Sequence, residues 1–478
     1  MEKQYETVIG LEVHVELATK TKIFCGCSTA FGGAPNTHTC PVCTGMPGSL
    51  PVLNKQVVEY ALAVGIAANC EINKSCRFDR KNYFYPDNPQ NYQISQLYFP
   101  ICINGYVEIE TPSGKKKVGI HEIHMEEDAG KLIHDEWEEV SLVDYNRSGV
   151  PLIEIVSEPD MRNADEVIAY LEKLRETIQY IGASDCKLQE GSMRADVNIS
   201  VREEGAEEFG TRTEMKNLNS FKAITRAIEG ERARQIALLE EGGEVIQETR
   251  RWDDAKECSY PMRSKEDAQD YRYFPEPDLA PVEIDDAWIL RIKSSLPEFR
   301  DAKMERYRKE FVIPEYDISI ITASKHMADL FEAAAAISGQ PKKVSNWLMG
   351  ETLRLLKEKE MDAEDIRFSP ENLAELIGLV DEKVITTSVA KEVFEVMFEN
   401  NVSPKVYVEE KGLKTVGDAD ALQKTVEEVI AANPQSVADY RNGKEKAIGF
   451  LVGQTMKAMQ GKADPGMVNS LLKELLVK

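Results

Sequence analysis

Acidic and imidazole side chains alternate with apolar residues near the start of the chain, in the stretch VIGLEVHVEL at residues 8–17. Strict alternation is the period of a half-buried β-strand, so Glu12, His14 and Glu16 would share one face. Neighbours in this row would stand roughly 6.5–7 Å apart, at two strand rises. Carboxylates and an imidazole at this spacing can help to bind a divalent metal ion, or they can form an ordinary solvated face.

More acids fall on the polar faces of other predicted strands. The stretch HMEED at 124–128 packs three carboxylates and one imidazole into five residues, and two further acids lie in the predicted strands 194–201 and 211–217. Oxygen-rich donor sets suit Mg²⁺, so these faces would form a magnesium site if they converged. For any one strand the alternative is a solvated antiparallel face. The candidate ligands are Glu12, His14, Glu126, Glu127, Asp196 and Glu214.

Two cations lie beside three aromatic residues in the stretch FDRKNYFYPDNPQNYQISQ at 78–96. Arg80 and Lys81 could contact phosphates while a neighbouring ring supports a base. The alternative is a loop that is anchored by its aromatic side chains.

Four of the nine cysteines form two close pairs, Cys25 with Cys27 and Cys40 with Cys43. Thiol pairs joined by a short Gly- and Pro-containing loop are typical of a tetrahedral structural Zn²⁺ site. Free thiols are the alternative, and His38 could replace one of the ligands. The remaining five cysteines are expected to be lone, buried thiols.

The elements that must position these residues change in character along the chain. Short alternating strands mix with helices up to about residue 293, and helical spacing prevails beyond it. The sequence therefore predicts an α+β protein with an N-terminal mixed α/β domain and an all-α second half. A polar, Gly-containing break at 410–418 precedes a last small helical unit. The strands expected in the first part are 105–111, 150–156, 194–201 and 211–217, and the helices are 54–68, 165–181 and 220–241.

Composition narrows the class of protein. The chain has 478 residues, of which 42% are hydrophobic and 29% charged, with a net charge of −24. No apolar run approaches the ~20 residues that span a bilayer, and the N-terminus does not resemble a signal peptide, so a cytoplasmic protein without a membrane partner is expected.

The negative net charge argues against polyanion binding by the whole surface. From Arg441 onward, however, seven Lys/Arg stand against three Asp/Glu, a local balance of +4.

Several common catalytic motifs are missing from the sequence. It contains no phosphate-binding GxxxxGK[ST] loop, no GxGxxG after a predicted strand and no GxSxG. Any nucleotide would therefore be bound without a P-loop, and no serine or cysteine nucleophile with its base can be recognised.

Six long stretches of the chain are distinctive, namely VIGLEVHVEL, FDRKNYFYPDNP, HMEEDAGK, NRSGVPLIEIVSEPD, EMKNLNSF and DYRYFPEPDL. They resemble one family, the B subunits of the aspartyl/glutamyl-tRNA amidotransferases. The similarity runs from Thr7 to the closing helices, and no large domain is inserted, which favours the three-subunit bacterial type over the archaeal Glu-specific subunit.

The resemblance implies a layout and a reaction. A catalytic cradle domain at 1–293, with a zinc knuckle at 25–43, would be followed by a helical domain at 294–409 and a YqeY-like tail domain at 410–478. ATP would phosphorylate the side-chain carboxylate of Glu-tRNA(Gln) or Asp-tRNA(Asn), and ammonia would then displace the phosphate to leave the amide. An amidase-like A subunit would release the ammonia from glutamine, and a small C subunit would complete a heterotrimer.

The resemblance also assigns roles to individual residues. The family's magnesium site maps onto Glu12, His14, Glu126, Glu127 and Glu214, which we also expect to be catalytic, with Asp196 as an outer partner. Arg80 and Lys81 are inferred to contact the phosphates of ATP, and the zinc site is expected to be structural. The closing motif GKEKAIGFLVGQTMKAMQGK places Lys444, Lys446, Lys457 and Lys462 against the tRNA backbone. A surface of ordinary solvated helices is the alternative for these lysines.

Two other functions stay open from the sequence. The first is a tRNA-binding scaffold subunit whose metal-binding face is not catalytic. The second is the archaeal-type enzyme that acts on Glu-tRNA(Gln) alone.

Overall fold

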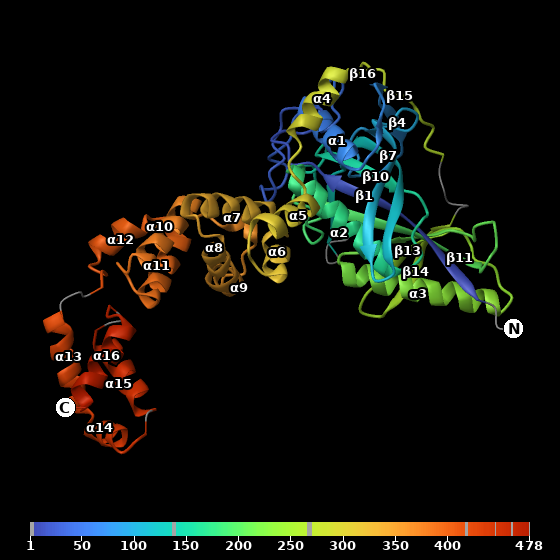
Figure 1. The fold of residues 1–478 in the computed structure, drawn as a ribbon. Coiled ribbons are helices and arrows are strands. Elements are labelled where there is room, and N and C mark those ends of the chain that lie inside the picture. The colour runs from blue at the N-terminus through green and yellow to red at the C-terminus, as the bar shows by residue number, and fades with distance from the viewer. Residues whose placement is uncertain are drawn as a thin grey trace. The chain divides into compact units, whose positions relative to one another are not determined.

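A computed structural model describes residues 4–135, 140–264, 270–415, 419–444, 446–459 and 462–477 of the chain. Its contacts divide the chain into two compact units, Met1–Phe299 and Arg300–Lys478. The named strands all belong to the first unit, and the named elements of the second unit are all helices (Figure 1). This combination confirms the predicted α+β class.

A nine-stranded sheet forms the centre of the first unit. Its strands are β1 (Tyr5–Glu16), β2 (Glu71–Ile72), β6 (Cys102–Thr111), β7 (Gly114–Glu127), β10 (Pro151–Ser157), β11 (Met193–Glu203), β12 (Thr213–Lys216), β13 (Glu248–Asp253) and β14 (Cys258–Ser264). Their order across the sheet is β14-β13-β12-β11-β1-β10-β7-β6-β2. All neighbours are antiparallel except β12 and β13, which run parallel. The predicted strands are therefore present, with the N-terminal strand at the middle of the sheet.

The alternation in β1 decides which face of the sheet meets the core. Leu11, Val13 and Val15 are buried in the same hydrophobic cluster as residues of three helices, whereas Glu12 and His14 are only half-buried. The helices are α1 (Lys55–Ala67), α2 (Ala164–Ile181) and α3 (Phe221–Glu240), and α4 (Asp286–Ser295) packs against α1. One face of the sheet is thus covered by apolar packing, and the opposite face carries the polar side chains.

Local capping explains where the long helices begin and end. The side chain of Asn163 accepts a hydrogen bond from the backbone of Glu166 at the start of α2, and Gly182 ends this helix in the left-handed conformation. At the start of α3 the side chain of Ser220 accepts from the backbone of Ala223. Ser220 is therefore the N-cap of α3.

Three smaller sheets complete the first unit. They consist of β15 (Phe274–Pro275), β4 (Asp79–Asn82) and β5 (Tyr92–Ser95), of β16 (Val282–Glu283) with β3 (Ser75–Cys76), and of β8 (Lys131–Asp135) with β9 (Val140–Asp144). Because side chains alternate along a strand, Lys81 points to one side of β4 while Arg80 and Asn82 point to the other.

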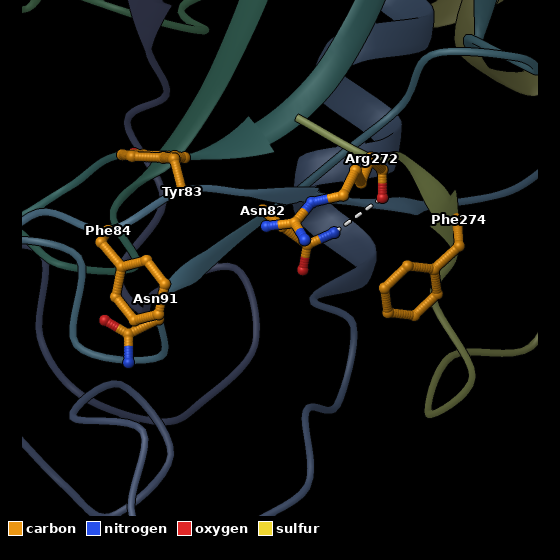
Figure 2. Close-up of a pocket in the computed structure, with 6 residues that line it drawn as sticks. All are labelled: Asn82, Tyr83, Phe84, Asn91, Arg272 and Phe274. Carbon is orange, nitrogen blue, oxygen red and sulfur yellow. Dashed lines mark hydrogen bonds between the residues drawn. The ribbon is translucent and has the colours of Figure 1, made fainter. Parts of the chain in front are cut away.

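A hollow of about 380 Å³ adjoins the Asn82 side of this three-stranded sheet (Figure 2). The Asn82 amide donates a 2.9 Å hydrogen bond to the backbone oxygen of Arg272, which fixes the segment that leads into β15. The lining residues are Asn82, Tyr83, Phe84, Asn91, Arg272 and Phe274.

The second unit is built from helices only in its described residues. They are α5 (Arg300–Glu310), α6 (Glu315–Ile321), α7 (Lys325–Ser338), α8 (Pro341–Trp347), the π-turn η2 (Leu348–Thr352), α9 (Leu353–Glu358), the 3₁₀ turn η3 (Ala363–Asp365), α10 (Pro370–Asp381), α11 (Thr387–Asn400), α12 (Pro404–Glu410), α13 (Ala419–Ala432), α14 (Pro434–Arg441), α15 (Ala447–Ala458) and α16 (Pro465–Val477). One apolar cluster contains buried residues from Tyr307 to Val408, and another contains those from Leu422 to Leu476. Among the described residues, no helix is both long and apolar enough to cross a membrane.

Candidate active site

Strand register brings polar side chains from four strands into one row across the central sheet. His14 of β1 pairs with Arg194 of β11 on one side and with Glu154 of β10 on the other. Glu154 in turn pairs with His124 of β7. Paired residues of antiparallel strands point to the same face, so these four side chains lie together on the polar face.

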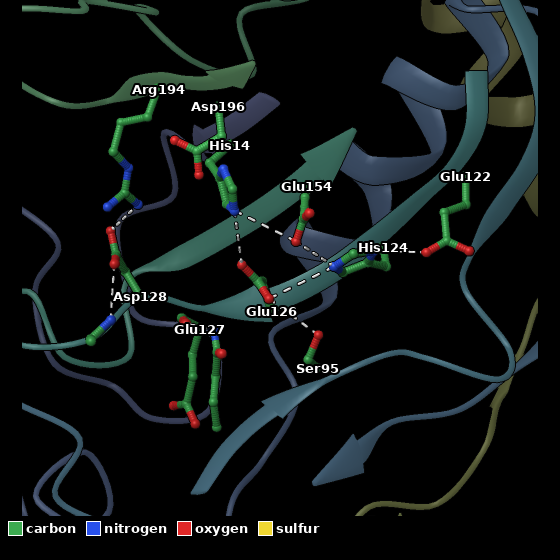
Figure 3. Close-up of polar contacts among 12 residues, drawn as sticks. His14, Ser95, Glu122, His124, Glu126, Glu127, Asp128, Glu154, Arg194 and Asp196 are labelled. Carbon is green, nitrogen blue, oxygen red and sulfur yellow. Dashed lines mark hydrogen bonds and ion pairs between the residues drawn. The ribbon is translucent and has the colours of Figure 1, made fainter. Parts of the chain in front are cut away.

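Two imidazoles and two carboxylates meet at the centre of this face (Figure 3). His14 Nε2 lies 3.5 Å from Glu154 Oε2 and 4.0 Å from Glu126 Oε1. His124 Nε2 lies 2.9 Å from Glu154 Oε2 and 3.7 Å from Glu126 Oε2. The hydroxyl of Ser95, on β5, donates a 3.1 Å hydrogen bond to Glu126 Oε2. The carboxylates of Glu126 and Glu154 are thus contacted by side chains from β1 and β7 of the central sheet, and Glu126 also by one from β5 of the small sheet.

The charges in this group shift one another's ionisation. Burial by itself would lower the pKa of His124, but the charge of Glu154 and contacts with Glu122 and Glu126 outweigh it and raise that pKa well above the usual value. The pKa of His14 is also raised: burial alone would lower it, but the hydrogen bond with Glu154 outweighs this effect. Burial opposes ionisation of Glu154, yet His124 and His14 hold its pKa well below the usual range. Ion pairs therefore stabilise the charged forms of this group.

We call His14, Glu126 and Glu154 the His14 group, because one ligand atom from each lies within 4.8 Å of the others. A second set with the same property, the Glu12 group, contains Glu12, Asp196 and Glu214. The two groups are neighbours, since Glu12 and His14 are two residues apart on β1. Ligand atoms this close can bind one ion per group, and carboxylates are the preferred ligands of Mg²⁺.

A lysine neutralises part of the Glu12 group. Lys216 Nζ lies 2.9 Å from Glu214 Oε1 and also contacts Asp196 Oδ2. The Glu12 carboxylate accepts a 2.9 Å hydrogen bond from the Asn198 amide, yet burial, followed by the charge of Glu154, raises its pKa. Extra positive charge near Glu12 would therefore stabilise its ionised form.

Lys81 brings a second cation to the polar face. Its ammonium lies 4.9 Å from the centre of the Tyr271 ring. Burial alone would lower the pKa of Lys81, but the negative charge of Glu126, together with that of Glu154, raises it. Lys81 therefore carries a positive charge toward the His14 group.

The structure does not place Glu127 in either group, contrary to the expectation that it is a ligand beside Glu126. Consecutive side chains on a strand point to opposite faces, and the Glu127 carboxylate turns away from the group in Figure 3. It accepts a 3.1 Å hydrogen bond from the backbone of Ile94, and burial raises its pKa to about 8. A carboxyl group in this state holds a proton at neutral pH, which is unfavourable for a metal ligand.

The structure also separates Arg80 from Lys81, its expected partner at the phosphates. The Arg80 guanidinium donates to Glu276 at 2.6 and 3.0 Å and to Asp278 at 3.0 Å, and it stacks on the ring of Tyr92. Because Arg80 is already paired with two carboxylates, the contacts indicate a structural ion pair.

Glu154 and His124 were not among the ligands expected from the sequence. Glu154 is the only acid between the apolar residues of β10, and His124 shares the parity of Glu126 on β7. Both facts can be read from the sequence, but neither says that β10 lies beside β1 and that β7 lies on the other side of β10. Glu16 lies on the same face of β1, where burial and Asp128 raise its pKa to about 8.

The four cysteines of the predicted zinc knuckle lie together in space. One sulfur from each of Cys25, Cys27, Cys40 and Cys43 lies within 4.8 Å of the others, and the Cys40 and Cys43 sulfurs are 3.9 Å apart. Tetrahedral Zn²⁺ with bonds of about 2.3 Å needs sulfurs about 3.8 Å apart, so the arrangement fits the metal. A hydrogen bond with Cys25, with a further contribution from Lys22, lowers the pKa of Cys43 to about 4. His38 is not part of this set.

The four lysines assigned to tRNA lie near α15. Lys446 precedes this helix and Lys457 lies in its last turn, and both side chains are exposed. Lys444 is exposed and lies 3.0 Å from Asp439, and Lys462 is partly buried.

Comparisons with known proteins cover nearly the whole chain. A family model described as the GatB/GatE catalytic domain matches residues 7–290, and one described as the GatB domain matches residues 329–476. A protein of Agathobacter rectalis, named as the B subunit of an aspartyl/glutamyl-tRNA(Asn/Gln) amidotransferase, is 74% identical over 99% of this chain and 100% of its own length. Proteins of the same name are 67% identical in Lachnoclostridium phytofermentans, over 100% of both chains, and 58% identical in Caldicellulosiruptor bescii, over 99% of this chain and 100% of that protein.

These matches confirm the resemblance predicted from the six sequence stretches. Both family models lie in the order expected along the chain, and the relatives are covered over their full length. The chain therefore belongs to the family of the B subunits of aspartyl/glutamyl-tRNA(Asn/Gln) amidotransferases.

Proposed function

We propose that this chain activates the side-chain carboxylate of Glu-tRNA(Gln) or Asp-tRNA(Asn) with ATP and then converts it to the amide with ammonia. The observation that carries the proposal is the convergence of the His14 group and the Glu12 group on one face of the central sheet, with Lys81 nearby. Family membership supplies the substrate class, and the polar face supports the type of chemistry.

The reaction needs two displacements. A carboxylate oxygen of the substrate attacks the γ-phosphorus of ATP, the bond to ADP breaks, and an acyl phosphate forms. The nitrogen of ammonia then attacks the acyl carbon, phosphate leaves with the former carboxylate oxygen, and the amide remains after loss of a proton. The first step brings several anions together, so it requires positive charge at the transferred group.

The acid groups fit Mg²⁺, which would be held by His14, Glu126 and Glu154 and by the acids of the Glu12 group. When bound, Mg²⁺ would neutralise the phosphate oxygens and orient ATP. The chain's own cations add to this effect. Lys81 directs its charge toward the His14 group, and Lys216 holds Asp196 and Glu214 in place through its two ion pairs.

The test replaces one carboxylate at a time in the full chain assembled with its partner subunits. Glu126→Gln and Glu12→Gln should abolish amidation of the charged tRNA, while the glutaminase activity of the same complex survives. Glu110→Gln, at an exposed position of β6, is the matched control and should keep the amidation rate of the wild type. Amidation near the wild-type rate in both site variants would contradict the assignment.

A tRNA-binding scaffold without catalysis remains the second candidate function. It predicts tRNA binding without ATP turnover, so release of ADP that depends on charged tRNA separates the two functions. Assays with Asp-tRNA(Asn) beside Glu-tRNA(Gln) then distinguish the dual-specificity enzyme from the Glu-specific type.

We further propose that the four-cysteine site binds structural zinc. The sulfur positions support this, because four cysteine sulfurs at this spacing can surround one Zn²⁺ ion as thiolate ligands. Elemental analysis of the purified chain should find about one zinc ion per chain.

The remaining parts of the proposal follow from the family. The chain would work in the cytoplasm in a heterotrimer with an amidase-like A subunit and a small C subunit. A cradle domain at 1–293 would perform the chemistry, and a helical domain at 294–409 would lead to a tRNA-binding tail at 410–478. The separate apolar clusters on either side of about residue 410 support this division.

A further inference from the structure

Lys22 is a fully buried lysine that the proposed reaction does not use. Its side chain is 0% exposed, and its ammonium donates to the backbone oxygen of His38 at 2.8 Å, to that of Tyr145 at 3.2 Å and to Cys43 Sγ at 3.4 Å. None of the ion pairs found among the described residues includes Lys22. A buried ammonium group is unfavourable unless an anion lies close to it, and carbonyl oxygens supply only partial charge.

The four-cysteine site can supply the missing anion. Four thiolates around one Zn²⁺ carry a net charge of −2, whereas four neutral thiols carry none. The 3.4 Å contact between the Lys22 ammonium and Cys43 Sγ therefore makes electrostatic sense when the site holds its metal. Hydrogen bonds to metal-bound ligands stabilise metal sites from outside the ligand set.

Lys22 also joins this site to a turn of residues 145–149, which we call the Arg147 turn. Besides the bond from Lys22 to Tyr145, the hydroxyl of Ser148 donates to the backbone oxygen of Cys43 at 3.0 Å. The backbone of Ile23, next to Lys22, donates to the oxygen of Gly149 at 3.0 Å. Gly149 has a φ of +83°. A Cβ atom added at this position would lie 3.5 Å from both Lys22 Cδ and Cys43 Cβ. The turn is thus packed directly on Lys22 and the four-cysteine site.

The Arg147 turn also contacts Asp128, which directly follows β7. The Arg147 guanidinium donates to the backbone oxygens of Ala129 and Gly130 at 3.0 and 2.8 Å, and it lies 3.7 Å from Asp128 Oδ2. The backbone of Gly149 donates to the oxygen of Asp128 at 2.9 Å. Asp128 follows Glu126 by two residues, so the turn holds the end of β7 that carries a residue of the His14 group.

We propose that Lys22 is a positioning residue whose buried charge balances the thiolates of the metal-loaded four-cysteine site and couples this site to the Arg147 turn. The inference rests on the proposed zinc content. Loss of the metal would leave the Lys22 ammonium without an anion, and the turn that fixes the end of β7 would loosen.

The test compares Lys22→Met with the wild type and with Lys20→Met, an exposed lysine two residues away. The full chains are loaded with Zn²⁺ or Co²⁺, and release of zinc to a chelator is followed over time. Lys22→Met should lose zinc about 10-fold faster or more, and the sulfur-to-cobalt charge-transfer band of its Co²⁺ form should shift. Hydrogen exchange at the amides of Ile23 and Gly149 should also accelerate. Lys20→Met should match the wild type in all three measurements.

Lys22→Arg keeps the charge and guards against a simple folding defect. The Lys22→Arg variant should show the circular dichroism spectrum of the wild type, and it should release zinc more slowly than Lys22→Met. Equal release rates for Lys22→Met and Lys20→Met would overturn the inference while leaving the zinc site intact. A wild-type chain that takes up neither Zn²⁺ nor Co²⁺ would overturn the zinc proposal itself, and the inference with it. A catalytically inactive chain that still binds zinc would count against the proposed reaction alone.

Discussion

The Nε2 atom of His124 lies 2.9 Å from the Oε2 atom of Glu154 on the neighbouring strand, at the centre of the polar face. The same oxygen lies 3.5 Å from Nε2 of His14, so one carboxylate joins imidazoles from two strands. Their mutual attraction raises the pKa of both histidines and lowers that of Glu154. The free protein thus keeps protons where the proposed reaction places a metal ion.

Magnesium binding should therefore release protons. A metal ligand must be deprotonated, and the raised pKa of His14 keeps its proton on the metal-free chain to a higher pH than usual. The apparent affinity for Mg²⁺ should therefore rise as pH increases above about 6.5, the ordinary pKa of histidine. Calorimetric titrations in buffers with different ionisation enthalpies measure the number of protons released, and a number near zero would contradict the prediction.

Glu154→Gln should impair the reaction as strongly as the two site variants proposed above. The amide cannot balance the charge of His124 and His14, and it is a weaker ligand for Mg²⁺. We expect ADP release that depends on charged tRNA to fall by about 100-fold or more. The control Glu110→Gln changes an exposed carboxylate of the same unit and should have no effect.

Glu127→Gln should make stability less dependent on pH. The folded state raises the pKa of Glu127 to about 8, whereas an unfolded chain has a value of about 4.3. The folded state thus binds a proton that the unfolded state releases, so the contribution of Glu127 to folding is lost as pH rises from about 4 to 8.

The amide variant stays neutral and can still accept the hydrogen bond from Ile94. At pH 8 its free energy of unfolding should therefore exceed that of the wild type by an amount on the order of a few kcal/mol, and near pH 4 the two should be similar. Urea unfolding at several pH values measures this difference. If Glu127 is instead an ionised metal ligand, the variant gains no stability at pH 8 and loses affinity for Mg²⁺.

Replacement by Met should mainly affect stability at Arg80 and mainly affect catalysis at Lys81. Arg80→Met leaves the buried carboxylate of Glu276 without its partner, so stability should fall by about 3–5 kcal/mol. Lys81→Met removes the charge that faces the His14 group, so kcat for ADP release should fall by about 100-fold with a smaller loss of stability. Thermal unfolding and steady-state kinetics of both variants test the pair, and the reverse pattern would restore Arg80 as a phosphate contact.

Replacing the exposed residues Lys446 and Lys457 with Ala should weaken tRNA binding without affecting ATP chemistry at saturating tRNA. Each lost phosphate contact should reduce the slope of log affinity against log salt by about 0.7–0.9. Lys424→Ala, at an exposed position of α13, is the control. A chain that ends at residue 410 should show the full loss of the tail's contribution, and unchanged affinity across salt concentrations would exclude the tail as a tRNA contact.

The local sequence determined which residues could share a face and which thiols could share a metal. Alternation in β1 places Glu12 and His14 opposite the apolar residues that meet the core, because the side-chain period of a strand is two. The short spacing within each cysteine pair likewise keeps its two thiols close. The long family stretches identified the family, and the helical spacing predicted helices in both units.

Only the tertiary structure decided which of these residues meet. The partners of β1 are β10 and β11, which lie more than a hundred residues away in sequence, and their register brings Glu154 and His124 beside His14. The same alternation that aligned Glu12 with His14 separates Glu127 from Glu126 and Arg80 from Lys81, and the partners of Glu127 and Arg80 come from other strands and loops. Periodicity acts along one strand, whereas register and ion pairing depend on packing between distant segments, so the first could be predicted and the second could not.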